Sequence, residues 1–261
     1  MDFPQSRALV PRLSVLEYAG STNDELVRAA TGADAASWPE LSVIVTDDQR
    51  SGRGRLDRVW SAPAGTSLAI SVLLRPSTSA PEFSVDSVGW IPLLAGLAMT
   101  RAVRSLGVDA TLKWPNDVLV GGKKLCGILS ELLPDGAGVV VGAGLNVSIT
   151  ADQLPVDTAT SLALAGLANP DPDAALAAYL TELQSLYRGF VAANGDAEAS
   201  GLHREVASAC DTIGRAVQVH VPGGAPLTGI ATGLDELGRL IVDTNDALTA
   251  VAAGDVTHLR Y

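Results

Sequence analysis

Two strand-like segments joined by a pair of glycines constrain the fold of this chain more than any other feature. Asp117–Val120 and Lys123–Leu133 are rich in Val, Leu and Ile, and Gly121-Gly122 between them suits a tight two-residue hairpin turn. A second turn at Pro134–Gly138 leads the chain into another apolar segment. The pattern predicts a sheet that is at least partly antiparallel. The further strands predicted in this part of the chain are Leu41–Thr46, Ser67–Leu74 and Val139–Gly142.

Helical patterns alternate with these strands. Gly20-Ser21-Thr22-Asn23 opens a helix, because it is followed by acidic residues at the spacing of a capping box and then by apolar residues. A longer helix is predicted at Val88–Leu106, and another at Asp173–Ala193, where Leu and Tyr recur at steps of three and four residues. Helices and a largely antiparallel sheet within one segment predict an α+β fold.

The residue pattern of the chain changes from about Asp211 onward. Short apolar segments are separated there by glycine-rich turns at Pro222-Gly223-Gly224 and Glu236-Leu237-Gly238, which predicts a small β-barrel of roughly 50 residues. We therefore expect two domains, at residues 1–210 and 211–261. The strands predicted for the second domain are Ala216–Val221, Leu227–Leu234, Arg239–Asp243 and Ala247–Ala253.

Composition excludes several classes of protein. The 261 residues carry a formal net charge of −11, which argues against general affinity for DNA or for anionic membranes. No apolar segment reaches about 18 residues, the length needed to span a bilayer. Cys126 and Cys210 lie far apart and the three histidines are scattered, so neither a disulfide framework nor a structural zinc site is indicated. These features fit a reducing cytoplasm.

One short basic segment stands out against this acidic background. Arg50–Trp60 contains four of the 18 basic residues, and its two glycines allow backbone N–H groups to turn toward one point. Arginine forks hold carboxylates and phosphates bidentately, and Trp60 offers a flat face for a ring. The segment therefore predicts an anion-binding loop between two strands. The alternative is a solvated turn whose arginines pair with nearby acids.

A second polar group surrounds the predicted hairpin. Lys113, Asn116, Asp117 and Lys124 stand among core-like Leu, Val and Ile residues. Taken singly, each is expected to face solvent, whereas four around one hairpin indicate a site. Neither familiar nucleotide motif is present, because Gly121-Gly122-Lys123-Lys124 lacks the Walker A spacing and Gly142-Ala143-Gly144 lacks the third glycine of a Rossmann fingerprint.

Five segments form a further pattern along the chain. They are Ser21-Thr22-Asn23 with Gln49, GRGRLDRVW at Gly52–Trp60, KWPND at Lys113–Asp117, KLCGIL at Lys124–Leu129, and GAGLN at Gly142–Asn146. Together these segments resemble the biotin protein ligase family, through most of the chain and in the family's order. One departure is Cys126 in KLCGIL, where the family usually has alanine, and it is expected to alter packing slightly. Few residues precede the first segment, so the chain resembles the single-function kind of ligase without an N-terminal DNA-binding domain.

The resemblance implies a class II synthetase-like catalytic domain with a mixed, largely antiparallel sheet packed with helices, followed by a small SH3-like β-barrel. It also implies a two-step reaction. Biotin and MgATP give biotinyl-5′-AMP and pyrophosphate, and the adenylate then acylates one lysine of a biotin carboxyl carrier protein. By similarity, catalysis is expected from Arg55, Arg58, Asp117 and Lys124. ATP contacts are expected from Arg58, Trp60, Lys113, Asn116 and Asn146. Biotin contacts are expected from Ser21, Thr22, Asn23, Gln49, Gly52, Arg53, Gly54, Arg55, Lys124 and Gly127, with Arg53 and Arg55 acting through their backbone.

Some points stay open at the level of sequence. Asp117 is expected either to bind Mg²⁺ or to lie near the incoming lysine amine. A lipoate–protein ligase is the nearest alternative, although GRGRLDR is the version of that loop found in biotin ligases. A biotin- or adenylate-binding regulator without transfer activity is a further alternative. We expect no membrane partner and no DNA partner, and the chain is expected to be a monomer or a homodimer.

Overall fold

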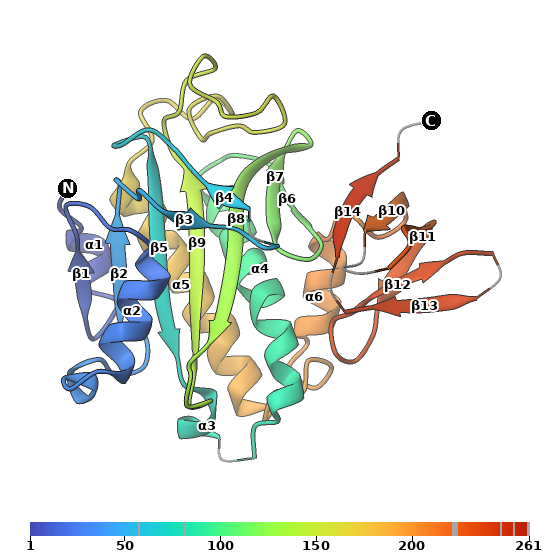
Figure 1. Ribbon diagram of the computed structural model, residues 1–261, viewed down its shortest axis with the longest axis horizontal. Coiled ribbons are helices and arrows are strands. Elements are labelled where there is room, and N and C mark those ends of the chain that lie inside the picture. Colours follow the sequence, from blue (N-terminus) through green and yellow to red (C-terminus); the bar gives the residue numbers. More distant parts are fainter. Residues whose placement is uncertain (57, 81, 221–223, 246, 253, 260–261) are drawn as a thin grey trace.

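The computed structural model describes residues 1–56, 58–80, 82–220, 224–245, 247–252 and 254–259. Its centre is a seven-stranded sheet in the order β1-β2-β5-β9-β8-β7-β6, in which β1 and β2 are parallel and all other neighbours are antiparallel. The expected mixed, largely antiparallel sheet is therefore confirmed (Figure 1). The strands are β1 Leu13–Val15, β2 Val43–Thr46, β5 Ser67–Leu74, β6 Ala110–Lys113, β7 Asp117–Val120, β8 Lys123–Leu132 and β9 Val139–Asn146.

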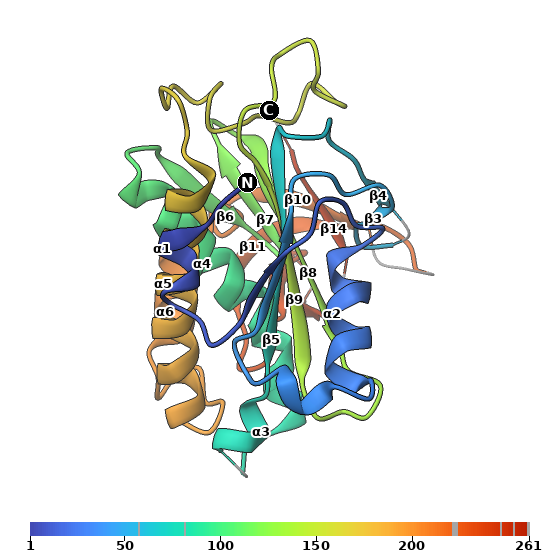
Figure 2. The same cartoon turned by 90° about the vertical axis from the view of Figure 1, so that its left-hand side faces the viewer.

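Helices cover the two faces of this sheet unequally (Figure 2). One face carries α4 (Ile91–Ser105), which contacts β6, β7, β8 and β9 and packs against α5 (Pro172–Ala192). The other face carries α2 (Thr22–Thr31), which contacts β2, β5 and β9. Short helical segments complete the chain, and they are α1 Pro4–Arg7, Ala35–Ser37, α3 Pro76–Ser79, Val85–Trp90 and α6 Leu202–Ala209.

The packing under α2 is confined to one half of that helix. Its small apolar cluster joins Leu26 and Ala30 to Ile44, Leu73 and Val140 of the sheet. The main core lies on the opposite face, between the sheet and the pair α4 and α5. The buried residues Thr22 and Asn23 in the N-terminal turn of α2 lie outside this apolar cluster.

The structure corrects several predicted boundaries. The helix expected at Val88–Leu106 begins as the 3₁₀ turn Val85–Trp90, and α4 starts at Ile91, because Pro92 has no N–H and is tolerated only in a first turn. The strand expected at Val139–Gly142 continues to Asn146, since glycine does not prevent pairing with both neighbours. The arginine segment, expected as a loop, contains the short hairpin β3 (Gly52–Arg53) and β4 (Val59–Trp60).

The C-terminal part forms a separate five-stranded antiparallel sheet in the order β13-β12-β11-β10-β14. Its fold class agrees with the expected small β unit, while the domain boundary at 210/211 stays a prediction. Val221, Ala253 and the predicted turn residues Pro222-Gly223 lie outside the described residues. The strands are β10 Ala216–His220, β11 Leu227–Leu234, β12 Leu240–Asp243, β13 Leu248–Val251 and β14 Asp255–His258.

Two buried tryptophans fasten this sheet to the larger one. Trp90 donates its indole N–H to the carbonyl of Glu236 at 2.8 Å, and Trp114 donates to the carbonyl of Gly238 at 3.0 Å. Both acceptors lie in the turn between β11 and β12, where Gly238 has a φ of 76°. Two side chains from outside the C-terminal sheet thus tie that sheet to the rest of the structure. Within the described ranges, no helix is long and apolar enough to cross a membrane.

A histidine at the junction between the two sheets predicts a pH dependence of stability. Burial, followed by the charge of Lys113, lowers the pKa of His258 to about 4, and Arg215 opposes protonation while Asp211 favours it. Between pH 4 and 6.5 the unfolded chain binds the proton more readily than the folded one, so stability falls as the pH drops through this window. The free energy of unfolding, measured in urea, should fall from pH 7 to pH 5, and this fall should be about 1–2 kcal/mol smaller in His258→Gln than in the unmodified protein. An equal fall in both proteins would contradict the assignment of this pH dependence to His258.

Candidate functional site

A cavity of about 140 Å³ opens on the face of the large sheet that carries α2. Its walls come from the N-terminus of α2, the arginine segment, and strands β5, β8 and β9. The sequence-predicted residues that line it are Ser21, Thr22, Asn23, Gln49, Arg53, Gly54, Arg55, Arg58, Trp60, Asn116, Asp117, Lys124 and Gly127. The structure therefore gathers most of the predicted site at one place, although the segments are far apart in sequence.

The floor of the cavity is backbone rather than side chain. Gly127 of β8 pairs with Gly144 of β9, and Gly142 lies on the same face two residues before Gly144. A Cβ atom at Gly144 would lie 2.5 Å from the Trp60 ring, and one at Gly127 would lie 3.4 Å from it. The indole thus packs closely over these two glycines and forms part of the cavity wall.

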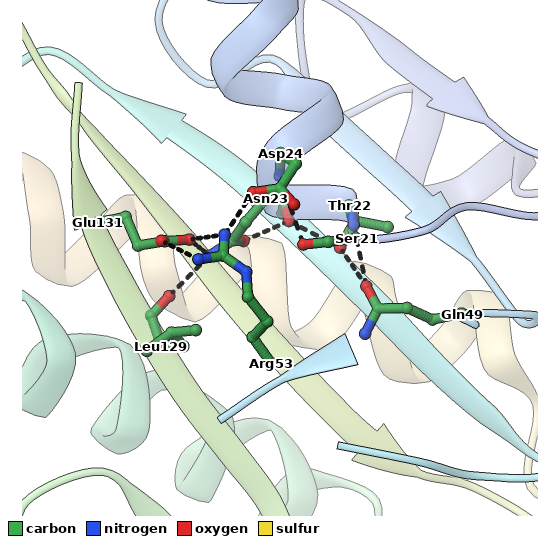
Figure 3. Close-up of polar contacts among 9 residues, drawn as sticks. Ser21, Thr22, Asn23, Asp24, Gln49, Arg53, Leu129 and Glu131 are labelled. Atoms are coloured by element: carbon green, nitrogen blue, oxygen red, sulfur yellow. Dashed lines mark hydrogen bonds and ion pairs between the residues drawn. The ribbon is translucent and has the colours of Figure 1, made fainter. Parts of the chain in front are cut away.

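The polar end of the cavity lies at the N-terminus of α2 (Figure 3). Ser21 caps the helix by accepting a bond from the backbone N–H of Asp24, as its capping pattern predicts. The backbone N–H of Thr22 donates to Gln49 Oε1 at 2.9 Å, and its hydroxyl lies 3.2 Å from the same oxygen. Ser21 and Thr22 are both buried. This end combines hydroxyl groups, an amide and the positive end of a helix dipole.

Lys124 and Asp117 form an ion pair at the edge of the same cavity. Lys124 Nζ lies 2.6 Å from Asp117 Oδ1 and 5.8 Å from the centre of the Trp60 ring. A bulge between β7 and β8 and two backbone bonds, from Lys124 N to Thr158 O and from Thr160 N to Lys124 O, brace this position. The absent side chain at Gly127 leaves room for the lysine, because a Cβ atom there would lie 3.0 Å from Nζ.

The four arginines of the segment have different partners. Arg50 pairs with Asp48, Arg53 pairs with Asp24 and Glu131, and Arg58 pairs with Asp255 of the C-terminal sheet. The alternative of arginines paired with acids thus describes three of them in this state. Arg55 instead lies 3.4 Å from Asn116 Oδ1 and 3.3 Å from Gly254 O, without an ion pair to an acid among the described residues.

Two cations near the cavity are partly desolvated. Burial lowers the pKa of the Arg55 guanidinium, an effect that Asp255 and Asp117 oppose. Burial likewise lowers the pKa of Lys113, which faces Asp117 and Asp255 as well as the cations Lys124 and Arg58. A bound anion would stabilise both charged forms, so this end of the cavity is electrostatically suited to phosphate or carboxylate.

Three predicted site residues do not line the cavity. Gly52 lies on the outer side of the arginine segment, where a Cβ atom would lie 2.6 Å from the Gln49 amide nitrogen and 2.5 Å from the Trp60 carbonyl. Lys113 is absent from the cavity lining, and its charge contributes to the lowered pKa of His258. Asn146 is buried and donates to the carbonyl of Thr160 at 2.8 Å, so its side chain here braces the 158–160 segment.

Sequence reasoning missed other residues of the site. Asp255 lines the cavity although it comes from the C-terminal sheet, and no motif in its Ala- and Gly-rich surroundings marks it. Gly142 and Gly144 were noted within GAGLN but were not assigned a place in the floor. Apolar wall residues gave no separate signal, since Ile70, Ile128 and Leu129 have the pattern of ordinary strands. Within the part of the chain that the structure describes, no cluster of three metal-ligating side chains occurs.

The chain is similar to known proteins over most of its length. Residues 18–146 match the Biotin/lipoate A/B protein ligase family, and residues 212–259 match the Biotin protein ligase C terminal domain. The biotin–[acetyl-CoA-carboxylase] ligase of Mycobacterium tuberculosis is 39% identical over 254 residues, covering 95% of this chain and 90% of that protein.

Solved structures are similar over almost the whole chain. Biotin protein ligase from Aquifex aeolicus in complex with biotin and ATP has a TM-score of 0.77 at 26% identity, covering 96% of this chain and all of that one. The Leishmania major enzyme in complex with biotinyl-5-AMP has a TM-score of 0.59 at 25% identity, covering 96% of this chain and 99% of that one. From its matched segments, its fold and its similarity to the mycobacterial enzyme, this chain belongs to the biotin protein ligase family.

Proposed function

We propose that this protein activates biotin with MgATP to biotinyl-5′-AMP and transfers the biotinyl group to a lysine of a biotin carboxyl carrier protein. The observation that carries the proposal is the cavity itself, which has hydroxyl and amide groups at one end and Arg55 with Lys124 at the other. Biotin has a polar ureido group at one end and a carboxylate at the other, with apolar rings between. The two ends of the cavity match this order.

In the first step a carboxylate oxygen attacks the α-phosphorus and pyrophosphate leaves. Two anions must approach each other, and positive charge in a partly desolvated site lowers the cost of that approach. Lys124 lies beside the glycine floor, while Arg55 is half-buried and Arg58 lines the same cavity. We assign these three cations to the charge that develops on the reacting carboxylate and phosphate. Trp60 is assigned to the adenine or its border, since its ring forms a flat wall.

The residues present fit Mg²⁺ in its usual mode with nucleotides. Mg²⁺ is commonly bound by one or two carboxylates together with substrate phosphates and water, and does not need a dedicated protein cage. Among the described residues, the carboxylates that line the cavity are those of Asp117 and Asp255. Asp117 would be the protein ligand, and the ion would neutralise phosphate charge when bound. Asp117 already contacts Lys124, so it also holds that amine in the site before any ligand arrives.

In the second step the carrier's lysine amine attacks the acyl carbon and AMP leaves. The nucleophile comes from the partner, so the enzyme contributes orientation and charge stabilisation. Cys126 next to the floor is no substitute nucleophile, because burial raises the pKa of its thiol well above the usual range. The mycobacterial relative is named for acetyl-CoA carboxylase, which supports the carrier domain of an acyl-CoA carboxylase as the partner. Both cysteines are buried free thiols, which supports a cytoplasmic setting, and the acidic charge supports a protein partner over DNA.

The polar end of the cavity favours biotin over lipoate. The ureido group of biotin donates and accepts hydrogen bonds, whereas the dithiolane ring of lipoate has no comparable group. Ser21, Thr22 and Gln49 would lose these partners with lipoate, and unpaired buried polar groups are costly. The lipoate alternative is therefore not favoured.

One experiment tests the reaction directly. The purified protein is incubated with MgATP and either biotin or lipoate, and acyl-adenylate and pyrophosphate are measured by mass spectrometry. We expect biotinyl-AMP in the biotin sample and no lipoyl-AMP in the other. Addition of a purified biotin carboxyl carrier domain should then consume the adenylate and add one biotinyl group per carrier. Formation of lipoyl-AMP alone would overturn the biotin assignment, and the absence of both adenylates would leave a binding protein.

A further inference from the structure

Arg53 lines the cavity, and its guanidinium extends to two acids outside that lining, Asp24 and Glu131 (Figure 3). Its Nη1 lies 2.9 Å from Glu131 Oε1 and its Nη2 lies 3.0 Å from Glu131 Oε2, which is a bidentate pair. Nη2 also binds Asp24 in the first turn of α2. The guanidinium thus joins the arginine segment to β8 and to α2 at once.

Glu131 is itself tied to the buried part of the sheet. Asn23 donates its amide to Glu131 Oε2 at 2.7 Å and to the carbonyl of Leu129 at 3.2 Å. The oxygen of the same amide accepts a bond from the fully buried Ser71 hydroxyl at 2.6 Å. Asn23 has room for these contacts because residue 142 is glycine, where a Cβ atom would lie 2.5 Å from Asn23 Oδ1. A continuous polar chain therefore runs from the core of the sheet to Arg53.

The position of Glu131 would be unfavourable for a site that binds anions unless the carboxylate had a partner. It lies on the same face of β8 as Gly127 and Leu129, both of which line the cavity. Its charge would repel a carboxylate or triphosphate in that cavity. Arg53 neutralises it, and the contact also fixes where β3 passes over the floor. The Glu131 side chain is 26% exposed and the Arg53 side chain is 46% exposed, so solvent screens part of this interaction.

We propose that Glu131, with Asp24, is a positioning residue that holds the arginine segment closed over the cavity, through Arg53. Arg53 then serves as the anchor of the segment rather than as a charge for the ligand, while Arg55 and Lys124 face the reacting groups. Asn23 supports the same arrangement from below, because its hydrogen bond orients the Glu131 carboxylate. The effect on ligand binding rests on the proposed function, whereas the effect on the segment does not.

The accessibility of the arginine segment can be measured with trypsin, because trypsin cleaves after arginine. In limited proteolysis without any ligand, we expect Glu131→Gln to increase the rate of cleavage after Arg55 and Arg58. The expected increase is about fivefold, because the variant loses one charged bidentate pair. Arg53→Lys keeps the charge but cannot form the fork, and we expect it to increase the rate in the same direction. Fragments are identified by mass spectrometry, which separates these sites from cleavage elsewhere.

Glu25→Gln is the matched control. Glu25 neighbours Asp24 on α2 and pairs with Arg28, away from the arginine segment, so cleavage in this variant should equal that of the unmodified protein. Circular dichroism melting of each variant shows whether the fold is retained. Glu131→Gln preserves the shape of the side chain, and the new amide oxygen can still accept the bond from Asn23. Arg53→Lys changes the opposite end of the contact, at an exposed residue.

Kinetics give an independent reading. If biotin is the substrate, Glu131→Gln should raise its KM about fivefold and leave kcat for adenylate formation unchanged, since the segment closes less often but reacts normally once closed. Faster cleavage supports the positioning role even if the protein proves not to use biotin, because that measurement contains no ligand. Cleavage of Glu131→Gln at the unmodified rate would overturn the proposal, whatever the KM, because Glu131 would then not hold the segment.

Discussion

Lys124→Ala should reduce the rate of biotinyl-AMP formation about 10²–10³-fold, the usual cost of removing one group that stabilises developing charge. Lys124 Nζ is held 2.6 Å from Asp117 and lies against Gly127 of the cavity floor. The substitution removes this cation and leaves the Asp117 carboxylate in a site that must accept two further anions. The loss should appear in kcat for the first step, measured by pyrophosphate release at saturating biotin and ATP.

The fold should survive this change. The side chain of Lys124 is 36% exposed, and an ion pair of this kind contributes about 0–1 kcal/mol to stability, so the melting temperature should move by only a few degrees. Lys123→Ala provides the matched control, because Lys123 is the exposed neighbour of Lys124 on β8 and does not line the cavity. Adenylate formation by Lys124→Ala at the unmodified rate would remove Lys124 from the mechanism, as would an equal loss in Lys123→Ala.

The parts of the fold that sequence reasoning predicted are those whose signals are local. The turn at Gly121-Gly122 was recognisable because both residues adopt positive φ, at 56° and 75°, which is what a two-residue hairpin demands. Strand β5 was predicted with its observed bounds, since all eight residues are buried and six of the eight are apolar. Strands β1, β6 and β14 were missed because each is only three or four residues long. Such strands depend on the neighbour that pairs with them, which no local pattern reveals.

The site was predictable where motif residues point into the cavity and not where they support it from behind. Asn146 belongs to a recognisable segment, yet its side chain donates a hydrogen bond to the carbonyl of Thr160 and does not line the cavity. Asp255 and Glu131 act through partners 197 and 78 residues away in sequence, so their roles arise only when the two sheets and the arginine segment are in place. Composition around either acid is unremarkable. Their assignment needed the fold.

The glycine floor gives the second large expected effect. Gly144→Ala should lower kcat/KM for adenylate formation about 100-fold, the cost associated with displacing a reacting or positioning group by about 1 Å. A methyl group at residue 144 would lie 2.5 Å from Trp60 Cε2 and 2.9 Å from its Nε1. The indole must shift, which moves β4 and therefore the end of the arginine segment that is paired with β3.

Backbone strain is not the cause of this effect, because Gly144 is absent from the residues with positive φ and alanine is compatible with a strand. Gly189→Ala separates the two explanations. Gly189 lies on the exposed side of α5 with nothing within 4 Å of a new Cβ atom, so this variant should keep full activity and gain about 0.5–1 kcal/mol of stability. The ATP and biotin dependence of Gly144→Ala should be measured separately. A larger rise in KM for ATP than for biotin is expected if Trp60 borders the adenine, whereas unaltered kinetics would mean that the indole is free to move and forms no wall of the site.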